Sequence, residues 1–204
     1  MTDQAGTLAV SHAVAADAER VVEVISEAFL HDPTWSWALP DPASRKRLWR
    51  LSVDGALRYP WILHTPAFEA VALWIPPGGT EFTPEVEAGI PDFLRETVGP
   101  RAGDVEELLA RFGAAHPRHE PHYYLGLLAT ADAHRGRGLG MTLLRENLAR
   151  MDREGIPSYL ESSNPANNQR YQSVGFVPVV SFRAPGDGPL VTGMWRAAGA
   201  HRHP

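Results

Sequence analysis

Apolar positions in the first part of the chain recur at two different spacings. Residues 7–14 alternate weakly between apolar and polar side chains, which predicts a first strand. Residues 17–30 and 43–58 instead carry apolar side chains at helical spacing, which predicts two helices. The stretch between them, 31–42, is interpreted as a loop. The chain is therefore expected to open with a strand and two helices.

The middle of the chain passes from a strand pattern to a helical pattern. Apolar runs at 61–64 and 68–75, separated by a short turn, predict a hairpin. Residues 84–98 and 103–112 then show helical spacing. Together they predict a helical insert at about 80–115.

The last third alternates short apolar runs with turns. An apolar run at 122–130 leads through a glycine-rich turn into an amphipathic run ending near Met151, which predicts a strand and then a helix. Beyond it the pattern predicts a strand at 158–161, a helix at 165–173 and strands near 176–183 and 190–196. The chain is thus predicted to be one α/β unit with an insert.

Composition narrows the class of protein. A chain of 204 residues is expected to form one domain with a substantial core. Its net charge of −5 argues against nucleic acid as a partner. It has no stretch long enough to span a membrane and no signal-peptide pattern, so we expect no membrane partner and a cytoplasmic location. It has no cysteine, which excludes a thiol nucleophile, and its nine histidines lack metal-ligand spacing, so we expect no metal.

The strongest chemical signal is the sequence Arg-Gly-Arg-Gly-Leu-Gly at 135–140, between a predicted strand and helix. Glycine at alternate positions lets an anion approach the backbone without a Cβ in its way. The helix start adds unpaired N–H donors and about half a positive charge. The two arginines add cationic donors for phosphate. The stretch therefore predicts phosphate binding; the plain alternative is a glycine-rich turn without a ligand.

Two familiar phosphate-binding signatures do not fit this stretch. A dinucleotide fingerprint needs a third glycine where this chain has Met141, although Gly136 and Gly138 fit the first two. A P-loop ends in Gly-Lys-Ser/Thr, and the only lysine of the chain is the distant Lys46.

A third pattern, Arg/Gln-x-x-Gly-x-Gly/Ala, is matched by Arg135, Gly138 and Gly140. In this the chain resembles the GNAT superfamily of acyl-CoA N-acetyltransferases, whose pyrophosphate loop has that pattern. The order of a short strand, an asparagine-bearing helix start and Tyr171 before Gly175-Phe176 also resembles the end of a GNAT domain.

The resemblance is specific over 123–182 and weaker elsewhere. Runs at 70–74, 115–117 and 160–162 are similar to the puromycin N-acetyltransferase-like branch, which would imply a role in antibiotic resistance. The superfamily resemblance implies an α/β (α+β) fold. Its central sheet would be mixed, mostly antiparallel and twisted, with about six to seven strands flanked by helices.

The resemblance also implies which residues bind acetyl-CoA as cosubstrate. They are the strand residues beside its pantetheine arm, the pyrophosphate loop and one asparagine at a helix start. In this chain they are Leu127, Leu128, Ala129, Arg135, Gly136, Arg137, Gly138, Leu139, Gly140 and Asn167. From composition alone the first three are only a buried strand, and Asn167 is equally a helix-capping residue.

Two residues are candidates for proton transfer. The resemblance implies that Tyr171 protonates the leaving CoA thiolate, which suits a phenol of pKa near 10 beside a thiol of pKa near 8.5. The alternative is a core tyrosine. Glu161, at the end of a predicted strand, is placed to take a proton from the acceptor amine, directly or through water. The alternatives are a structural carboxylate and a chain of waters.

Trp35 and Trp37 follow the first predicted helix, at a point that flanks the acceptor pocket in the resembled fold. They are candidates for acceptor binding; core packing is the alternative. We interpret the chain as a single domain, 1–204, with a flexible tail at about 198–204.

Its expected activity is direct transfer of acetyl from acetyl-CoA to a primary amine of a small molecule, by a monomer or homodimer. A non-catalytic acyl-CoA-binding regulatory module and a protein or peptide N-acetyltransferase remain as alternatives.

Overall fold

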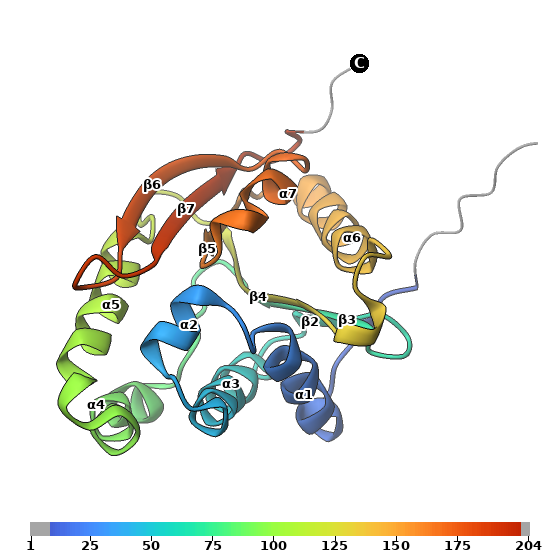
Figure 1. The fold of residues 1–204 in the computed structure, drawn as a ribbon. Helices are drawn as coiled ribbons and strands as arrows, with labels where there is room; N and C mark the ends of the chain where they lie inside the picture. The colour runs from blue at the N-terminus through green and yellow to red at the C-terminus, as the bar shows by residue number, and fades with distance from the viewer. Residues whose placement is uncertain (1–8, 201–204) are drawn as a thin grey trace, which may run out of the picture.

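A seven-stranded sheet runs through residues 9–200, the part of the chain that this computed structural model describes. The strand order is β1-β2-β3-β4-β5-β7-β6, and all neighbours are antiparallel except β4 and β5, which are parallel (Figure 1). The strands are β1 (Ser11–His12), β2 (Ile62–His64), β3 (Ala70–Ile75), β4 (Tyr123–Thr130), β5 (Ser158–Ser162), β6 (Val177–Arg183) and β7 (Leu190–Arg196). The predicted mixed, mostly antiparallel sheet is confirmed.

Helices cover both faces of this sheet. They are α1 (Ala18–Ala28), α2 (Pro33–Ala38), α3 (Pro42–Ala56), α4 (Pro84–Val98), α5 (Ala102–Ala115), α6 (Leu139–Glu154) and α7 (Asn168–Gln172), with short 3₁₀ turns η1 (Ala15–Asp17), η2 (Gly99–Arg101), η3 (Asp132–His134) and η4 (Pro165–Asn167). Figure 1 shows α1 and α3 on one side of β3 and β4, and α6 on the other. Successive strand residues point to opposite faces, so Val71 and Leu73 join the α1 side of the core and Ala70 and Ala72 the α6 side.

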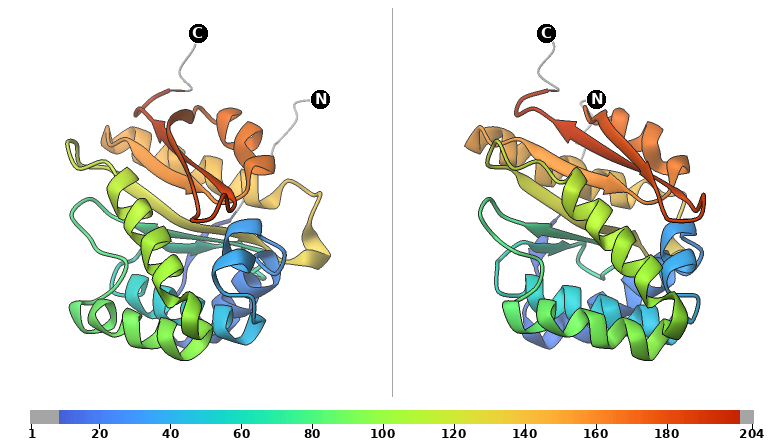
Figure 2. Two further views of the ribbon diagram at one scale, coloured as in Figure 1. Left: turned by 60° about the vertical axis from the view of Figure 1, so that its left-hand side comes forward. Right: turned by 90° about the vertical axis from the view of Figure 1, so that its left-hand side faces the viewer.

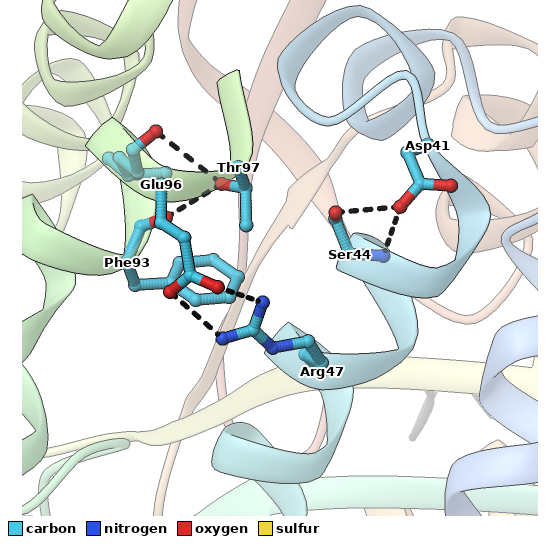
Figure 3. Close-up of polar contacts among 7 residues, drawn as sticks. Asp41, Ser44, Arg47, Phe93, Glu96 and Thr97 are labelled. Atoms are coloured by element: carbon cyan, nitrogen blue, oxygen red, sulfur yellow. Dashed lines mark hydrogen bonds and ion pairs between the residues drawn. The ribbon is translucent and has the colours of Figure 1, made fainter. Parts of the chain in front are cut away.

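The predicted helical insert corresponds to α4 and α5, which lie between β3 and β4 in the chain. Both are green in Figure 2, where α5 passes beside the β6–β7 hairpin. Figure 3 shows the link from α3 to α4: Arg47 holds Glu96 by two hydrogen bonds of 3.0 and 3.3 Å and lies over the Phe93 ring. Exposed ion pairs contribute little, about 0–1 kcal/mol. Burial of Phe93 and Leu94 therefore does more to hold the insert in place.

One extra residue, Gly126, interrupts the pairing of β4 with β3. Leu73 pairs with Leu127 and Trp74 with Leu125, so Gly126 forms a β-bulge. As a result Leu125 packs on the α6 side of the sheet and Leu127 on the α1 side. Two residues that are two positions apart would otherwise share a face. The bulge therefore changes which side chains of β4 point to each face.

Beside this bulge, β4 and β5 separate. Among residues 9–200, the last two residues through which β4 and β5 pair are Leu125 and Leu160. Both strands continue beyond this point, β4 to Thr130 and β5 to Ser162. The end of β5 remains paired with β7 on its other edge. An opening is therefore left in the middle of the sheet.

Some of the predicted secondary structure is wrong. The stretch 31–42, interpreted as a loop, contains α2, because Asp32 caps the helix and Pro33 occupies its first position. Asp32 Oδ1 accepts hydrogen bonds from two backbone N–H groups at 3.0 Å each. The first strand, expected at 7–14, comprises only Ser11–His12 among the described residues; 7 and 8 lie outside them, as do 201–204 of the predicted tail.

Within residues 9–200, the helices are all too short or too polar to cross a membrane.

Candidate active site

A cavity of about 580 Å³ lies where β4 and β5 separate. Its wall combines segments that are distant in sequence: the end of α1 and the start of α2, Phe112 of α5, β4 from Tyr124 onwards, the loop before α6, the end of β5, and α7. The cavity thus brings together the loop at 135–140, Tyr171 and Glu161.

The loop before α6 presents backbone donors to this cavity. Gly136 and Gly138 have positive φ angles of 78° and 76°, a conformation that glycine adopts without strain. The first hydrogen bond of the helix runs from the Thr142 N–H group to the Gly138 carbonyl at 2.9 Å. The N–H groups of 139–141 therefore have no acceptor within the helix. All three of these residues line the cavity, so this end of it favours an anion.

The two loop arginines are placed differently. Arg135 lines the cavity, while its Nε lies 2.9 Å from Asp132 Oδ1 and its Nη2 donates to the Ala28 carbonyl at 2.9 Å. Arg137 contacts His134 at 3.1 Å and is not among the residues of the cavity wall. Of these two loop arginines, Arg135 is therefore the one that lies at the cavity wall.

The candidate residues of β4 are divided by the bulge. Leu128 lines the cavity, together with Gly126. The side chains of Leu127 and Ala129 are buried in the core on the α1 side. Leu127 and Ala129 can therefore contact a ligand in the cavity only through their backbone atoms.

Asn167 also lines the cavity, and its side chain makes no capping hydrogen bond. The side chain that caps here is Asn164, before the 3₁₀ turn η4, whose Oδ1 accepts from the Ala166 N–H group at 3.0 Å. The capping interpretation of Asn167 is therefore wrong: its Oδ1 instead accepts a hydrogen bond from Arg170 Nη1 at 3.2 Å, and Arg170 also lines the cavity.

Tyr171 lines the cavity from α7, and its ring packs against Phe176. Burial, with a further contribution from the Asp32 carboxylate, raises the pKa of Tyr171 to about 12. The phenol is therefore protonated across the neutral range, as a proton donor must be. Because thiols ordinarily titrate near 8.5, full transfer to a thiolate is uphill in isolation. A hydrogen bond to the developing negative charge is the contribution that this environment favours.

Asp32 is a residue of the cavity wall that the sequence interpretation missed. Besides capping α2, it accepts a hydrogen bond at Oδ2 from the Ser163 hydroxyl at 2.7 Å. Thr34 in turn donates to the Ser163 carbonyl at 2.6 Å. Burial raises the pKa of Asp32. These bonds fix α2 against the segment that follows β5, and the dipeptide Asp32-Pro33 was the signal in the sequence for this helix start.

Only one of the two candidate tryptophans reaches the cavity. Trp35 lines it and stacks on Phe112 of α5, with ring centroids 5.9 Å apart. Trp37 lies under the Arg101 guanidinium at 4.8 Å, beside a separate hollow. The structure therefore does not bring Trp37 to the predicted acceptor site.

Glu161 lines the cavity with a side chain that is only 2% exposed. Its Oε1 lies 3.7 Å from His116 Nδ1, and its buried Oε2 has no hydrogen-bond partner among residues 9–200. A buried carboxylate oxygen without a partner is costly, so a cationic or proton-donating ligand would be stabilised beside it. Among the described residues, no group of three or more His, Asp or Glu side chains is arranged to hold a metal ion.

Comparison with known proteins agrees with this geometry. The model of the acetyltransferase (GNAT) family matches residues 73–176. A Corynebacterium glutamicum structure, described as histone acetyltransferase HPA2 and related acetyltransferase, is 27% identical, with a TM-score of 0.64 and a match that covers 95% of this chain and 98% of that one.

Two other solved structures share the fold at lower identity. Arylalkylamine N-acetyltransferase 2 of Aedes aegypti is 14% identical, with a TM-score of 0.68 and coverage of 95% of this chain and 100% of that one. The polyamine N-acetyltransferase of Drosophila melanogaster is also 14% identical, with a TM-score of 0.65 and coverage of 93% and 99%. These matches do not single out the puromycin N-acetyltransferase-like branch.

Proposed function

Because this chain belongs to the GNAT acetyltransferase family, we propose that it transfers the acetyl group of acetyl-CoA directly to the primary amine of a small molecule. The observation that carries the proposal is the cavity that has the loop at 135–140, Tyr171 and Glu161 in one wall. The arylalkylamine and polyamine N-acetyltransferases that share the fold support an amine as the acceptor.

The loop end of the cavity fits the pyrophosphate of CoA. The N–H groups of 139–141 lack helical acceptors, and Arg135 adds a cation beside them. Gly126 and Leu128 line the continuation of the cavity along β4, where the pantetheine arm would lie, and Asn167 faces it from the other side. Acetyl-CoA supplies an activated thioester; the protein binds and orients it.

The other end of the cavity fits the acceptor and the proton transfers. The carboxylate of Glu161 attracts an ammonium group and accepts its proton, leaving a neutral amine that can attack. Tyr171 donates a hydrogen bond to sulfur as negative charge develops there. The absence of cysteine, the usual acyl-carrying thiol, supports direct transfer, and the alternative is another side chain that carries the acetyl group.

The surroundings of this end favour a small acceptor over a protein segment. Trp35 of α2 and Phe112 of α5 enclose it with stacked rings. The insert that carries Phe112 thus covers the acceptor end, and we propose that it limits the size of the amine.

A matched pair of glycine variants tests the binding site. Gly138 and Gly155 lie at opposite ends of α6 with φ angles of 76° and 71°, and a Cβ at either position would meet no atom within 4 Å. The backbone strain of Gly138→Glu and Gly155→Glu should therefore be similar. Only Gly138→Glu places a negative charge at the cavity, and we expect it to weaken acetyl-CoA binding by about ten- to a hundredfold. Calorimetric titration of both variants measures this, and equal affinities would overturn the loop assignment.

Activity is tested by thiol release from acetyl-CoA with arylalkylamines, linear polyamines and lysine peptides as acceptors. We expect release that depends on a small amine and that, at subsaturating acetyl-CoA, falls in Gly138→Glu. Tight binding without release would favour the regulatory module, and release with peptides alone would favour the protein acetyltransferase.

A further inference from the structure

Two histidine rings follow Glu161 in a row, and the first of them, His116, is partly exposed while the second, His122, is buried. His116 Nδ1 lies 3.7 Å from Glu161 Oε1, and Nε2 of the same ring lies 3.1 Å from His122 Nε2. The exposed fraction of the side chain rises from 2% at Glu161 to 28% at His116. Neither histidine is part of the cavity wall. His116 therefore connects the cavity wall with solvent, and the buried His122 lies behind it.

Three different elements hold these groups together. Glu161 is on β5, His116 follows the last residue of α5, and His122 directly precedes β4. The ring of His116 packs edge-on against Tyr124 and Tyr159, with centroids 4.9 and 5.2 Å away. This packing fixes the ring so that Nδ1 faces the carboxylate.

The hydrogen bonds determine where the ring protons are. His122 Nδ1 lies 2.7 Å from the Glu120 carbonyl, which only accepts, so His122 Nδ1 carries a proton. A neutral His122 then offers a lone pair at Nε2, and His116 Nε2 must donate to it. His116 Nδ1 is left as the basic nitrogen of its ring, and it faces Glu161. The second histidine thus orients the first, as in other catalytic networks.

The two tyrosines beside His116 are unsuited to carry this proton. Burial, followed by the charge of Glu161, raises the pKa values of Tyr124 and Tyr159 far above the neutral range. Both hydroxyls therefore stay protonated and neither accepts a proton from the carboxyl group.

The remaining titratable neighbours also leave His116 as the acceptor. Burial raises the pKa of Glu81, and the charge of Glu161 adds to this effect, so Glu81 favours its protonated form, which cannot take up a second proton; Ser52 donates to its Oε1 at 2.9 Å. Burial lowers the pKa of His122, which keeps its orienting lone pair available. His119 is exposed and acts on His122 only as a nearby positive charge.

We infer that His116 is a relay residue of the proposed transferase, which takes from Glu161 the proton that the acceptor ammonium gives up. The inference rests on the proposed function. The ammonium N–H bond breaks, its electron pair stays on nitrogen, and its proton moves to Glu161 Oε2. A turn of the carboxyl group brings this O–H to His116 Nδ1, which accepts the proton. The partly exposed imidazolium then releases one proton to water, so the Glu161 carboxylate is restored for the next turnover.

Two probes of the same shape test the relay. Benzylamine is protonated at neutral pH, whereas phenylhydrazine is largely neutral and has no such proton to lose. With His116→Gln we expect kcat/KM for benzylamine to fall by about tenfold or more, and that for phenylhydrazine to stay unchanged. The KM for acetyl-CoA should not move. His119→Gln, which alters an exposed neighbour of the same type, should behave as wild type.

Equal losses with both probes would show a merely structural role for His116, and no loss with benzylamine would exclude the relay. If the wild type acetylates neither probe, the result counts against the proposed class of acceptor. The relay is then tested by a measurement that needs no catalytic turnover. Nitrogen NMR of the histidine rings then reports their tautomers. We expect neutral His116 with its proton on Nε2 and His122 with its proton on Nδ1; neutral His116 with its proton on Nδ1 would overturn the inference.

Discussion

Replacing Tyr171 by phenylalanine is expected to lower kcat by about 10²–10⁴-fold, the range that a positioned proton donor contributes. The variant loses one hydroxyl from the cavity wall and keeps the ring that packs on Phe176. Affinity for acetyl-CoA should change little, because the donor is needed only as charge develops on sulfur. Steady-state kinetics, with acetyl-CoA binding measured on the same preparation, separates the two effects.

Tyr123→Phe is the matched control. It removes a tyrosine hydroxyl that donates to Glu154 at 2.7 Å, outside the cavity wall. We expect it to cost about 0.5–1.5 kcal/mol of stability and to leave kcat unchanged. A Tyr171→Phe enzyme with nearly normal turnover and a comparable loss of stability would assign Tyr171 to the core instead.

Glu161→Gln is expected to lower kcat/KM for a basic amine by about 10²-fold or more at neutral pH, because the amide cannot accept a proton. The substitution keeps the size of the side chain beside His116, so the cavity should retain its shape. The defect should shrink as the pH rises, since a growing share of the amine then arrives already neutral. A profile of kcat/KM against pH for both enzymes measures the effect.

The control for charge alone is Glu154→Gln, which removes a carboxylate paired with Tyr123 away from the cavity. It should follow the wild-type profile. If Glu161→Gln did so as well, a chain of waters would be the proton acceptor and Glu161 a structural carboxylate.

Local signals in the sequence were sufficient to predict the strand and the helix on either side of the phosphate loop. Glycine spacing and the change from strand to helical period place the 135–140 loop, and the structure puts it at a strand-to-helix junction with its amides on a cavity. Such features depend on neighbouring residues, which a single sequence displays directly. The helix at 33–38 was not predicted, although the local sequence Asp32-Pro33 is typical of a helix start.

Features that depend on distant segments were not predictable in this way. The Gly126 bulge exists only in the pairing of β4 with β3, and it decides that Leu127 turns into the core. Likewise, Glu161 and His116 are 45 positions apart and meet only because α5 ends beside β5. Trp35 and Trp37 have the same local context, and packing against α5 selects the first.

Direct transfer of acetyl to an amine is tested most directly by following a labelled acetyl group. Wild-type protein is incubated with acetyl-CoA carrying an isotopic label in the acetyl carbons and with the best amine from the thiol-release assay, and all products are analysed by mass spectrometry. We expect one labelled N-acetyl product for each free thiol formed, and no labelled protein. Thiol without N-acetylated amine, or label held covalently on the protein, would contradict direct transfer to an amine in this cavity.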